Sequence, residues 1–91
     1  MTFMKGVHGN MVHELDARGL LCPLPVLKTR KRLMALEPGA QIEVQTDDPA
    51  AVVDMPHFCA EAGHRLIEVC ERGDVMIWLI EKGSMFQTPE K

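Results

Sequence analysis

Glycine and proline residues divide this chain into short segments, and this division limits the possible fold more than any other sequence feature. These residues interrupt both helices and strands. The interruptions lie at Gly19, Pro38, Gly39, Pro49, Gly63 and Gly73. Each intervening segment has the length of one helix or one strand. Because 91 residues leave room for one hydrophobic core of useful size, we expect a single domain.

The first half of the chain predicts a strand, a helix and a second strand. Residues 12–17 alternate in the manner of a strand, and residues 41–46 do so again. Between them we expect a helix from about Cys22 to Glu37. At helical spacing its apolar side chains share one face, which also contains Arg30, and we expect the stem of Arg30 to pack there. The apolar residues of this face are Val26, Leu27, Leu33, Met34 and Leu36.

The second helix has clear start and stop signals. Asp48 is expected to cap its first turn, with Pro49 inside that turn. Pro56 lies in its interior and predicts a kink or two short segments. Gly63 is a natural residue for its C-terminal end.

The last segments predict a hairpin and complete the fold. Residues 65–71 and 75–81 read as two strands joined around residues 72–74, which have the sequence Arg-Gly-Asp. The element order is therefore β-α-β-α-β-β. Helical crossovers place both helices on the same face of the sheet. We predict an α/β two-layer sandwich, with a four-stranded mixed sheet and two helices on one face.

Composition excludes several classes of function. A net charge of −3 disfavours a direct nucleic-acid binder, and no segment approaches the roughly 18 apolar residues of a membrane span. Residues 1–13 lack the pattern of a secretory signal peptide. Three irregularly spaced cysteines do not form a disulfide framework, so we expect a cytoplasmic protein with free thiols.

Cys22 is the strongest candidate for chemistry. It immediately precedes Pro23 at the expected start of the first helix, and Pro25 follows within the first turn. Helix N-termini carry a partial positive charge, and Arg18 could add to it. We therefore expect a lowered pKa for the Cys22 thiol, with the two prolines orienting it. A thiolate in this position could act as a nucleophile in sulfur exchange.

The motifs of this chain resemble those of the TusA (SirA-like) family of sulfur carriers. The resemblance rests on Cys-Pro-Leu-Pro at residues 22–25, preceded by Leu-Asp-Ala-Arg-Gly-Leu at residues 15–20. It continues through Asp-Asp-Pro at 47–49, Asp-Met-Pro at 54–56, Phe-Cys at 58–59 and Gly-His at 63–64. It covers residues 14–83, and we expect a sulfur-carrier domain at 13–83, with a flexible lead-in at 1–12 and a polar tail at 84–91.

The resemblance implies a specific activity. The matching cysteine, Cys22, would accept sulfane sulfur as a persulfide from a cysteine desulfurase or a rhodanese, and downstream relay proteins would receive it. Leu24 occupies a variable position that is acidic in the best-known tRNA-thiolation members and apolar in other branches, including those of sulfur-oxidising bacteria. The pathway therefore stays open between tRNA thiolation, molybdenum cofactor and sulfur oxidation. No cofactor is expected, and neither membrane nor direct nucleic-acid contact.

The other thiols and the histidines have weaker claims to function. Cys59 is expected to pack in the second helix, with a secondary thiol role as the alternative, and Cys70 is expected to be a structural residue of a strand. No Cys or His pair has the spacing of a zinc site, so we predict no metal. The methionines at 34, 55 and 76 are expected in the core rather than around copper.

Three basic residues of the first helix are candidates for partner binding. Lys28, Lys31 and Arg32 lie opposite its apolar face, starting about one turn after Cys22. They form either a solvated surface or a docking site for an acidic partner. We expect a monomer that meets its partners transiently. The alternatives are a regulatory or interaction module of the same fold, without sulfur transfer, and a metal-binding redox sensor.

Overall fold

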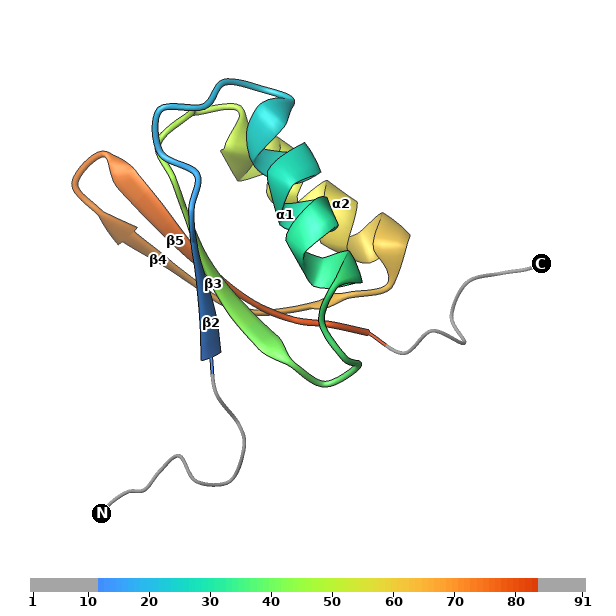
Figure 1. Cartoon of the computed structure of the whole chain (residues 1–91). Coiled ribbons are helices and arrows are strands. Elements are labelled where there is room, and N and C mark those ends of the chain that lie inside the picture. Colours follow the sequence, from blue (N-terminus) through green and yellow to red (C-terminus); the bar gives the residue numbers. More distant parts are fainter. Residues whose placement is uncertain (1–11, 84–91) are drawn as a thin grey trace, which may run out of the picture.

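The computed structural model describes residues 12–83 and has the predicted order of elements (Figure 1). The predictions for the lead-in before residue 12 and for the tail from 84 to 91 lie outside the described residues. The elements are β2 (Val12–Asp16), α1 (Leu24–Met34), β3 (Gln41–Thr46), α2 (Ala51–Ala62), β4 (Arg65–Arg72) and β5 (Val75–Glu81). No helix within the described range is long and apolar enough to cross a bilayer.

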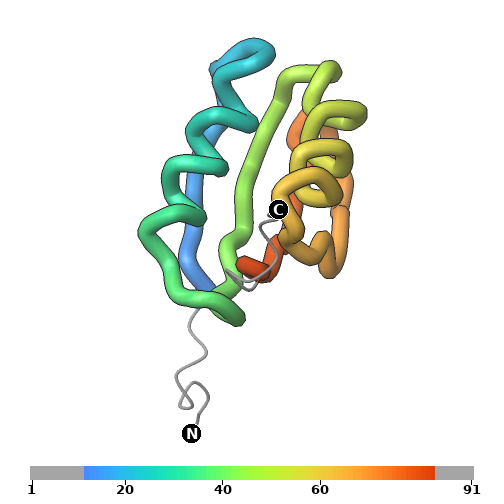
Figure 2. Tube along the Cα trace, turned by 90° about the vertical axis from the view of Figure 1, so that its right-hand side faces the viewer, coloured from blue at the N-terminus to red at the C-terminus, as the bar shows by residue number. Residues whose placement is uncertain are grey.

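The four strands form one mixed sheet in the order β2-β3-β5-β4. β2 pairs with β3 in parallel, and the other two pairs are antiparallel. Both helices cover the same face of the sheet, as the side view in Figure 2 shows. Both also begin at the same edge of this layer and run in the same direction (Figure 1). The predicted two-layer α/β fold is confirmed.

The core lies between the helices and the centre of the sheet. Alternate residues of β3 and β5 are fully buried there and meet Leu33 of α1 and Met55 of α2. Trp78 is the largest of them, and its indole Nε1 donates a hydrogen bond of 2.9 Å to Thr46 Oγ1. This bond satisfies both buried polar groups, which would otherwise each cost free energy.

Helix α1 is shorter than predicted and packs through a different face. It ends at Met34 instead of Glu37, because the N–H groups of Ala35 and Leu36 bond three residues back and tighten the last turn. Its buried residues are Pro25, Thr29 and Leu33. Thr29 can be buried because its Oγ1 donates to the Pro25 carbonyl oxygen at 2.8 Å.

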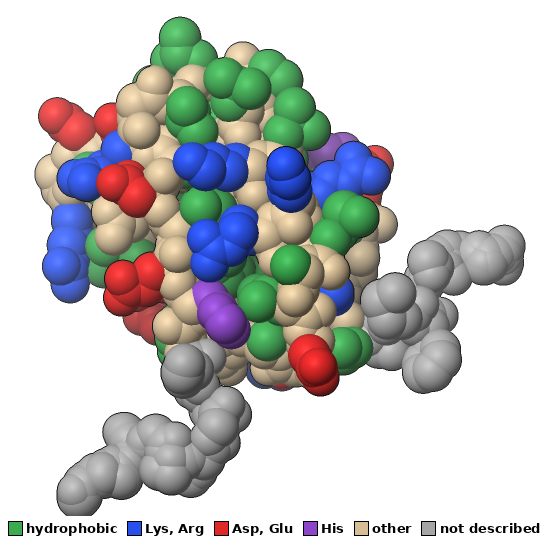
Figure 3. All heavy atoms as spheres, viewed as in Figure 1, with side chains coloured by type: hydrophobic (Ala, Val, Ile, Leu, Met, Phe, Trp, Pro, Cys, Tyr) green, Lys and Arg blue, Asp and Glu red, His purple; other side chains and the backbone are tan. Residues whose placement is uncertain are grey.

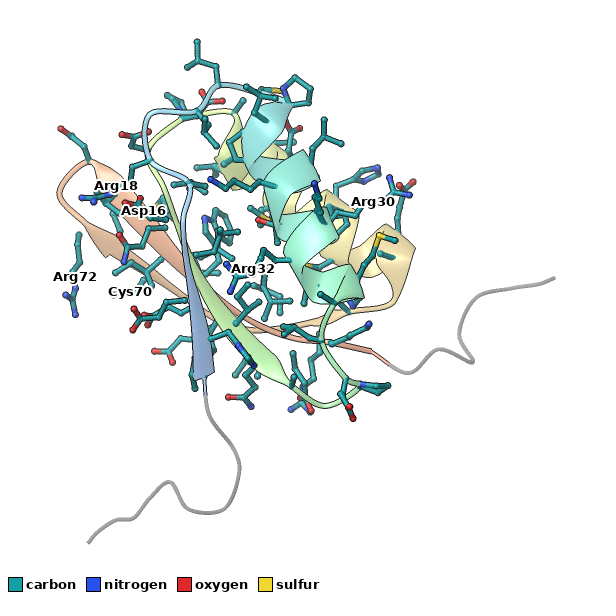
Figure 4. The ribbon with its side chains drawn as sticks, in the orientation of Figure 1. Asp16, Arg18, Arg30, Arg32, Cys70 and Arg72 are labelled. Atoms are coloured by element: carbon teal, nitrogen blue, oxygen red, sulfur yellow. The ribbon has the colours of Figure 1, made fainter. Side chains whose placement is uncertain are left out.

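Three predicted members of the packed face of α1 are instead exposed. Leu27 is 48 % exposed and Met34 is 72 % exposed, and Arg30 also faces solvent. Arg30 leaves α1 on the side away from Arg32 (Figure 4). The buried residues 25, 29 and 33 are spaced by four and form the row that packs inward. The three exposed residues lie off that row.

Helix α2 begins later than predicted and is continuous. Its first residue is Ala51, and no side chain caps its N-terminus. Pro56 lies inside one uninterrupted helix, so of the two predicted alternatives, a kink or two short segments, the second is wrong. Gly63 ends the helix with a φ of 80°, a left-handed conformation that glycine adopts without a steric penalty.

A β-bulge changes the faces of β4. The register shifts between Leu66 and Glu68, so Leu66 and Val69 lie opposite the core residues Ile80 and Trp78. Cys70 therefore lies on the opposite side of the sheet from Leu66. Cys70 pairs with Ile77, is exposed, and lies with Arg72 on the side of the sheet away from the helices (Figure 4).

Candidate functional site

Cys22 is exposed in the turn that connects β2 with α1. The turn spans residues 21–24 and contains a cis peptide bond between Cys22 and Pro23. The Leu24 N–H donates to the Leu21 carbonyl oxygen at 2.8 Å and closes it. Because the helix begins at Leu24, Cys22 lies two residues before the helix, and the predicted helix start at Cys22 is wrong by that amount.

Two aspartates from the loop before α2 hold this connection in place. The Gly19 N–H donates to Asp47 Oδ1 at 2.9 Å, and the Cys22 N–H donates to Asp48 Oδ2 at 2.6 Å. Gly19 has a φ of 83°, which a residue with a side chain rarely adopts. Asp48 therefore does not cap α2 as predicted, and its second oxygen only accepts a long bond of 3.3 Å from the Ala50 N–H.

The side chain of Cys22 is directed at a carboxylate. Its Sγ–H donates to Asp54 Oδ2 at 3.0 Å, and Asp54 lies in the first turn of α2. This hydrogen bond raises the pKa of the Cys22 thiol, with further contributions from desolvation and from the negative charges of Asp54 and Asp48. The expected lowering of the pKa is therefore wrong: the carboxylates of Asp54 and Asp48 face the thiol, and Cys22 lies two residues before the helix begins.

Arg18 does not supply positive potential to Cys22 as expected. Its guanidinium binds the Asp16 carboxylate through two bonds of 2.8 and 2.9 Å, and Figure 4 shows the two side chains next to each other. Its backbone N–H donates to the same carboxylate at 3.0 Å. These bonds hold the pKa of Asp16 well below its usual range and raise that of Arg18. Asp16 lies only two residues away, and the fork geometry of Arg favours this pairing.

The two prolines occupy different environments. Pro23 is exposed and is the residue that immediately precedes the helix, whereas Pro25 is buried in its first turn. Pro25 therefore anchors the start of α1 to the core. Pro23 fixes the backbone next to Cys22 at the surface, because its ring restricts φ.

The predicted basic residues lie on the outer side of α1. Lys28 and Lys31 are exposed, and Arg32 is half-buried. Figure 3 shows basic side chains over α1, below a group of apolar side chains at the end where the helices begin. A shallow groove connects the two kinds of surface, and its lining residues are Leu20, Leu24, Leu27, Lys28 and Lys31.

The other candidate ligands and thiols are not part of this arrangement. Cys59 is buried in the core as predicted, and its burial raises the pKa of its thiol to about 11. His57 pairs with Glu61 on the surface of α2, and His64 Nδ1 accepts from the Gly83 N–H. Between residues 12 and 83, no group of three or more His, Cys, Asp or Glu side chains is arranged to hold a metal ion.

The aspartates around Cys22 are not among the predicted site residues. The sequence predicts a helix cap at Asp48 and no role for the carboxylates of Asp47 and Asp54. A signal was present, because two helices that cross to the same face of a sheet begin at the same edge. Residues in the loop before α2 and in its first turn are therefore neighbours of the loop before α1, although they are 26 to 32 residues away from Cys22 in sequence.

Comparison with known proteins gives a consistent result. The profile of the family described as "Sulfurtransferase TusA" matches residues 13–82. The sulfur carrier protein TusA of Allochromatium vinosum is 42% identical over 69 residues, which are 76% of this chain and 91% of that protein. YrkI of Bacillus subtilis, described as a proposed sulfur carrier protein, is 39% identical over 69 residues, 76% of this chain and 92% of YrkI.

A solved structure agrees with these sequence relatives. The crystal structure of a SirA-like protein from Desulfitobacterium hafniense has a TM-score of 0.70 and 28% sequence identity. The match covers 81% of this chain and all of that one. The described domain is therefore common to all three relatives.

Proposed function

This chain belongs to the TusA family of sulfur carriers, and we propose that it takes up sulfane sulfur as a persulfide on Cys22 and passes it to a partner protein. The observation that carries the proposal is the setting of the Cys22 thiol. It is exposed on a turn whose backbone is held by Asp48, and its Sγ has a hydrogen-bond acceptor in Asp54. Cys59 is buried, and Cys70 is exposed on the side of the sheet away from the helices.

Sulfur uptake requires no oxidant in this proposal. Cys22 Sγ bonds to the outer sulfur of a persulfide on the donor, and the bond between the two donor sulfurs breaks. The donor leaves as a thiolate, and the transferred sulfur keeps its oxidation state. Delivery repeats the same exchange, with an acceptor thiol attacking the outer sulfur held on Cys22.

A partner would dock on the surface formed by α1 and the Cys22 turn. The basic residues Lys28, Lys31 and Arg32 suit an acidic partner, and the exposed apolar residues Leu24 and Leu27 suit a transient interface. Donors would be a cysteine desulfurase or a rhodanese, and acceptors would be downstream relay proteins of the cytoplasm. Pathways of tRNA thiolation, molybdenum cofactor synthesis and sulfur oxidation would all be served by this chemistry.

The deciding experiment measures the mass of the intact protein after incubation with a donor. With a desulfurase and cysteine, or a rhodanese and thiosulfate, the wild type should gain about 32 Da, the mass of one sulfur, reversibly removed by dithiothreitol. Cys22→Ser should show no adduct, whereas Cys59→Ser and Cys70→Ser should keep it. Cys22→Ser should stay folded, because its hydroxyl can also donate to Asp54.

Two results would contradict the proposal. An adduct that persists in Cys22→Ser would assign the chemistry to another cysteine. No adduct in the wild type with several competent donors would instead favour a regulatory or interaction module of the same fold.

The docking surface is tested separately by charge reversal. Lys28→Glu with Lys31→Glu should slow sulfur uptake from a protein donor by about tenfold at low salt, and the difference should shrink at high salt because exposed charges are screened beyond roughly 8–10 Å. Arg72→Glu on the opposite side of the sheet, a single reversal, is the control for a charge change away from α1. If the double variant and the control take up sulfur at the same rate, these lysines are ordinary solvent-exposed residues without a role in docking.

A further inference from the structure

The carboxylate of Asp54 is placed for one specific interaction. It lies in the first turn of α2, is half-buried, and its Oδ2 is 3.0 Å from Cys22 Sγ. Within residues 12–83 it forms no ion pair, so no nearby cation holds it in place or neutralises it. Its hydrogen-bond partner is the reacting atom of the proposed function.

The surroundings of Cys22 oppose the formation of a free thiolate. The charged groups that face it are Asp54 from α2 and Asp48 from the loop before α2, both negative, and they raise the pKa of the thiol. Asp47 lies beside them and binds the Gly19 N–H, while Arg18 is paired with Asp16. Since the thiolate is the nucleophile in sulfur exchange, uptake near neutral pH needs another way to remove the proton.

We propose that Asp54 is a catalytic residue that accepts the Cys22 thiol proton as Sγ attacks the donor persulfide. The inference rests on the proposed function of Cys22 as the sulfur-carrying residue. A carboxylate within hydrogen-bond distance of the proton meets the geometric requirement for a general base. Because the proton moves during the attack, no population of free thiolate has to form first.

The step balances in atoms and charge. The S–H bond of Cys22 breaks and its proton bonds to Asp54 Oδ2, while the Cys22 sulfur forms a bond to the outer sulfur of the donor. The donor S–S bond breaks, and its electron pair stays on the donor cysteine as a thiolate. Asp54 then returns its proton to that thiolate, which restores the carboxylate for the next cycle. The Cys22 sulfur rises from the thiol to the persulfide oxidation level, and the donor cysteine sulfur falls by the same amount. The transferred outer sulfur does not change its oxidation state.

The test compares the rates at which wild type and Asp54→Asn gain the sulfur adduct between about pH 6.5 and 8.5. The ratio of the two rates cancels the pH dependence of the donor. Asp54→Asn has to use free thiolate, whose population rises about tenfold per pH unit below its pKa. The variant should be about 100-fold slower at the acidic end and approach the wild type at the alkaline end.

Two further variants separate catalysis from charge and structure. Asp54→Glu keeps a carboxylate and should recover much of the rate. Glu61→Gln makes the same change of net charge on the exposed surface of α2, two turns away, and should load at the wild-type rate. Alkylation of Cys22 by iodoacetamide should be faster in Asp54→Asn, because losing the negative charge lowers the pKa of the thiol. That result would show that the thiol is still accessible.

The outcomes distinguish this inference from the function on which it rests. If Asp54→Asn gains sulfur as fast as the wild type or faster at every pH, Asp54 acts only through its charge and the inference is wrong, while the sulfur-carrier function stands. A variant that is equally slow at every pH would also overturn it, since the defect would then be structural. If the wild type gains no adduct, both fail.

Discussion

The helix layer has a starting edge, where α1 and α2 begin, and an ending edge, where they finish. The charges at both edges complement the helix dipole, but they make different contacts. At the starting edge, where α1 and α2 begin, the nearest charged groups are the carboxylates of Asp47, Asp48 and Asp54. At the ending edge, the last turn of α1 carries Lys31 and Arg32, and Lys82 lies below it. Anions near helix starts and cations near helix ends both complement the helix dipole.

The difference between the edges is burial. Lys82 is only 8% exposed, and its Nζ donates to the Leu36 carbonyl oxygen at 2.6 Å just beyond α1. The carboxylates of the starting edge are more exposed and bind backbone N–H groups and a thiol. Negative charges that suit a helix start therefore work against a thiolate placed there. The buried ammonium at the ending edge contacts the fold alone, whereas the carboxylates at the starting edge surround the Cys22 thiol.

The largest expected effect is at the ending edge. Lys82→Ala removes a buried ammonium and leaves the Leu36 carbonyl without its partner, so the free energy of unfolding should fall by about 2–3 kcal/mol. Lys82→Met keeps the apolar stem and should lose less. Urea unfolding measures both, and sulfur uptake by the folded protein should be unchanged. A loss below about 0.5 kcal/mol in Lys82→Ala would show that this edge is not held by Lys82.

The next effect compares the thiols of the two edges at alkaline pH. The Cys59 thiol, in the last turn of α2, ionises near pH 9 in the unfolded chain and near 11 in the folded one. The folded state therefore binds more protons in this interval, and stability should fall by up to about 2 kcal/mol as the pH rises from 9 to 11. Cys59→Ala should show a shallower decline, measured by urea unfolding at each pH. The raised pKa of Cys22 also makes stability fall as the pH rises. Cys22→Ser removes this second contribution and is measured in the same way. Equal slopes for Cys59→Ala and wild type would contradict the burial argument.

The smallest effect on stability is expected at the starting edge. Asp48→Ala removes the acceptor of the Cys22 N–H and should lower the free energy of unfolding by about 1–2 kcal/mol. It should also slow sulfur uptake, because the turn that carries the thiol loses its tether. Asp48→Asn keeps an acceptor oxygen and should retain most of both properties. Normal uptake by a destabilised Asp48→Ala protein would mean that the tether serves only the fold.

Local signals explain why the fold was largely predictable. The alternation in residues 41–46 and the Gly63 helix end are set by neighbouring residues, and both are confirmed. The faces of α1 and β4 depend on contacts between distant segments. Thr29 is buried because Pro25 provides an acceptor, and the bulge near Ile67 shifts every later residue of β4 to the other face.

The candidate site was predictable in its central residue but not in its surroundings. The Cys-Pro-Leu-Pro motif singles out Cys22 from one short stretch of sequence. The partners of that residue come from the start of α2, and they reverse the expected direction of its pKa shift. The residues next to Cys22 in sequence do not reveal the direction of this pKa shift. The nearby cation, Arg18, forms its ion pair with Asp16 and does not contact Cys22.

The tether between the Cys22 turn and the loop before α2 has a consequence for evolution. The Gly19 and Cys22 anchors are backbone N–H groups, so they do not depend on the side chains at positions 21 and 24. The side chains of Leu21 and Leu24 lie on either side of Cys22 in sequence and are exposed, and neither side chain takes part in the anchoring. Substitution at these two positions can therefore alter which proteins recognise the carrier while the thiol keeps its place.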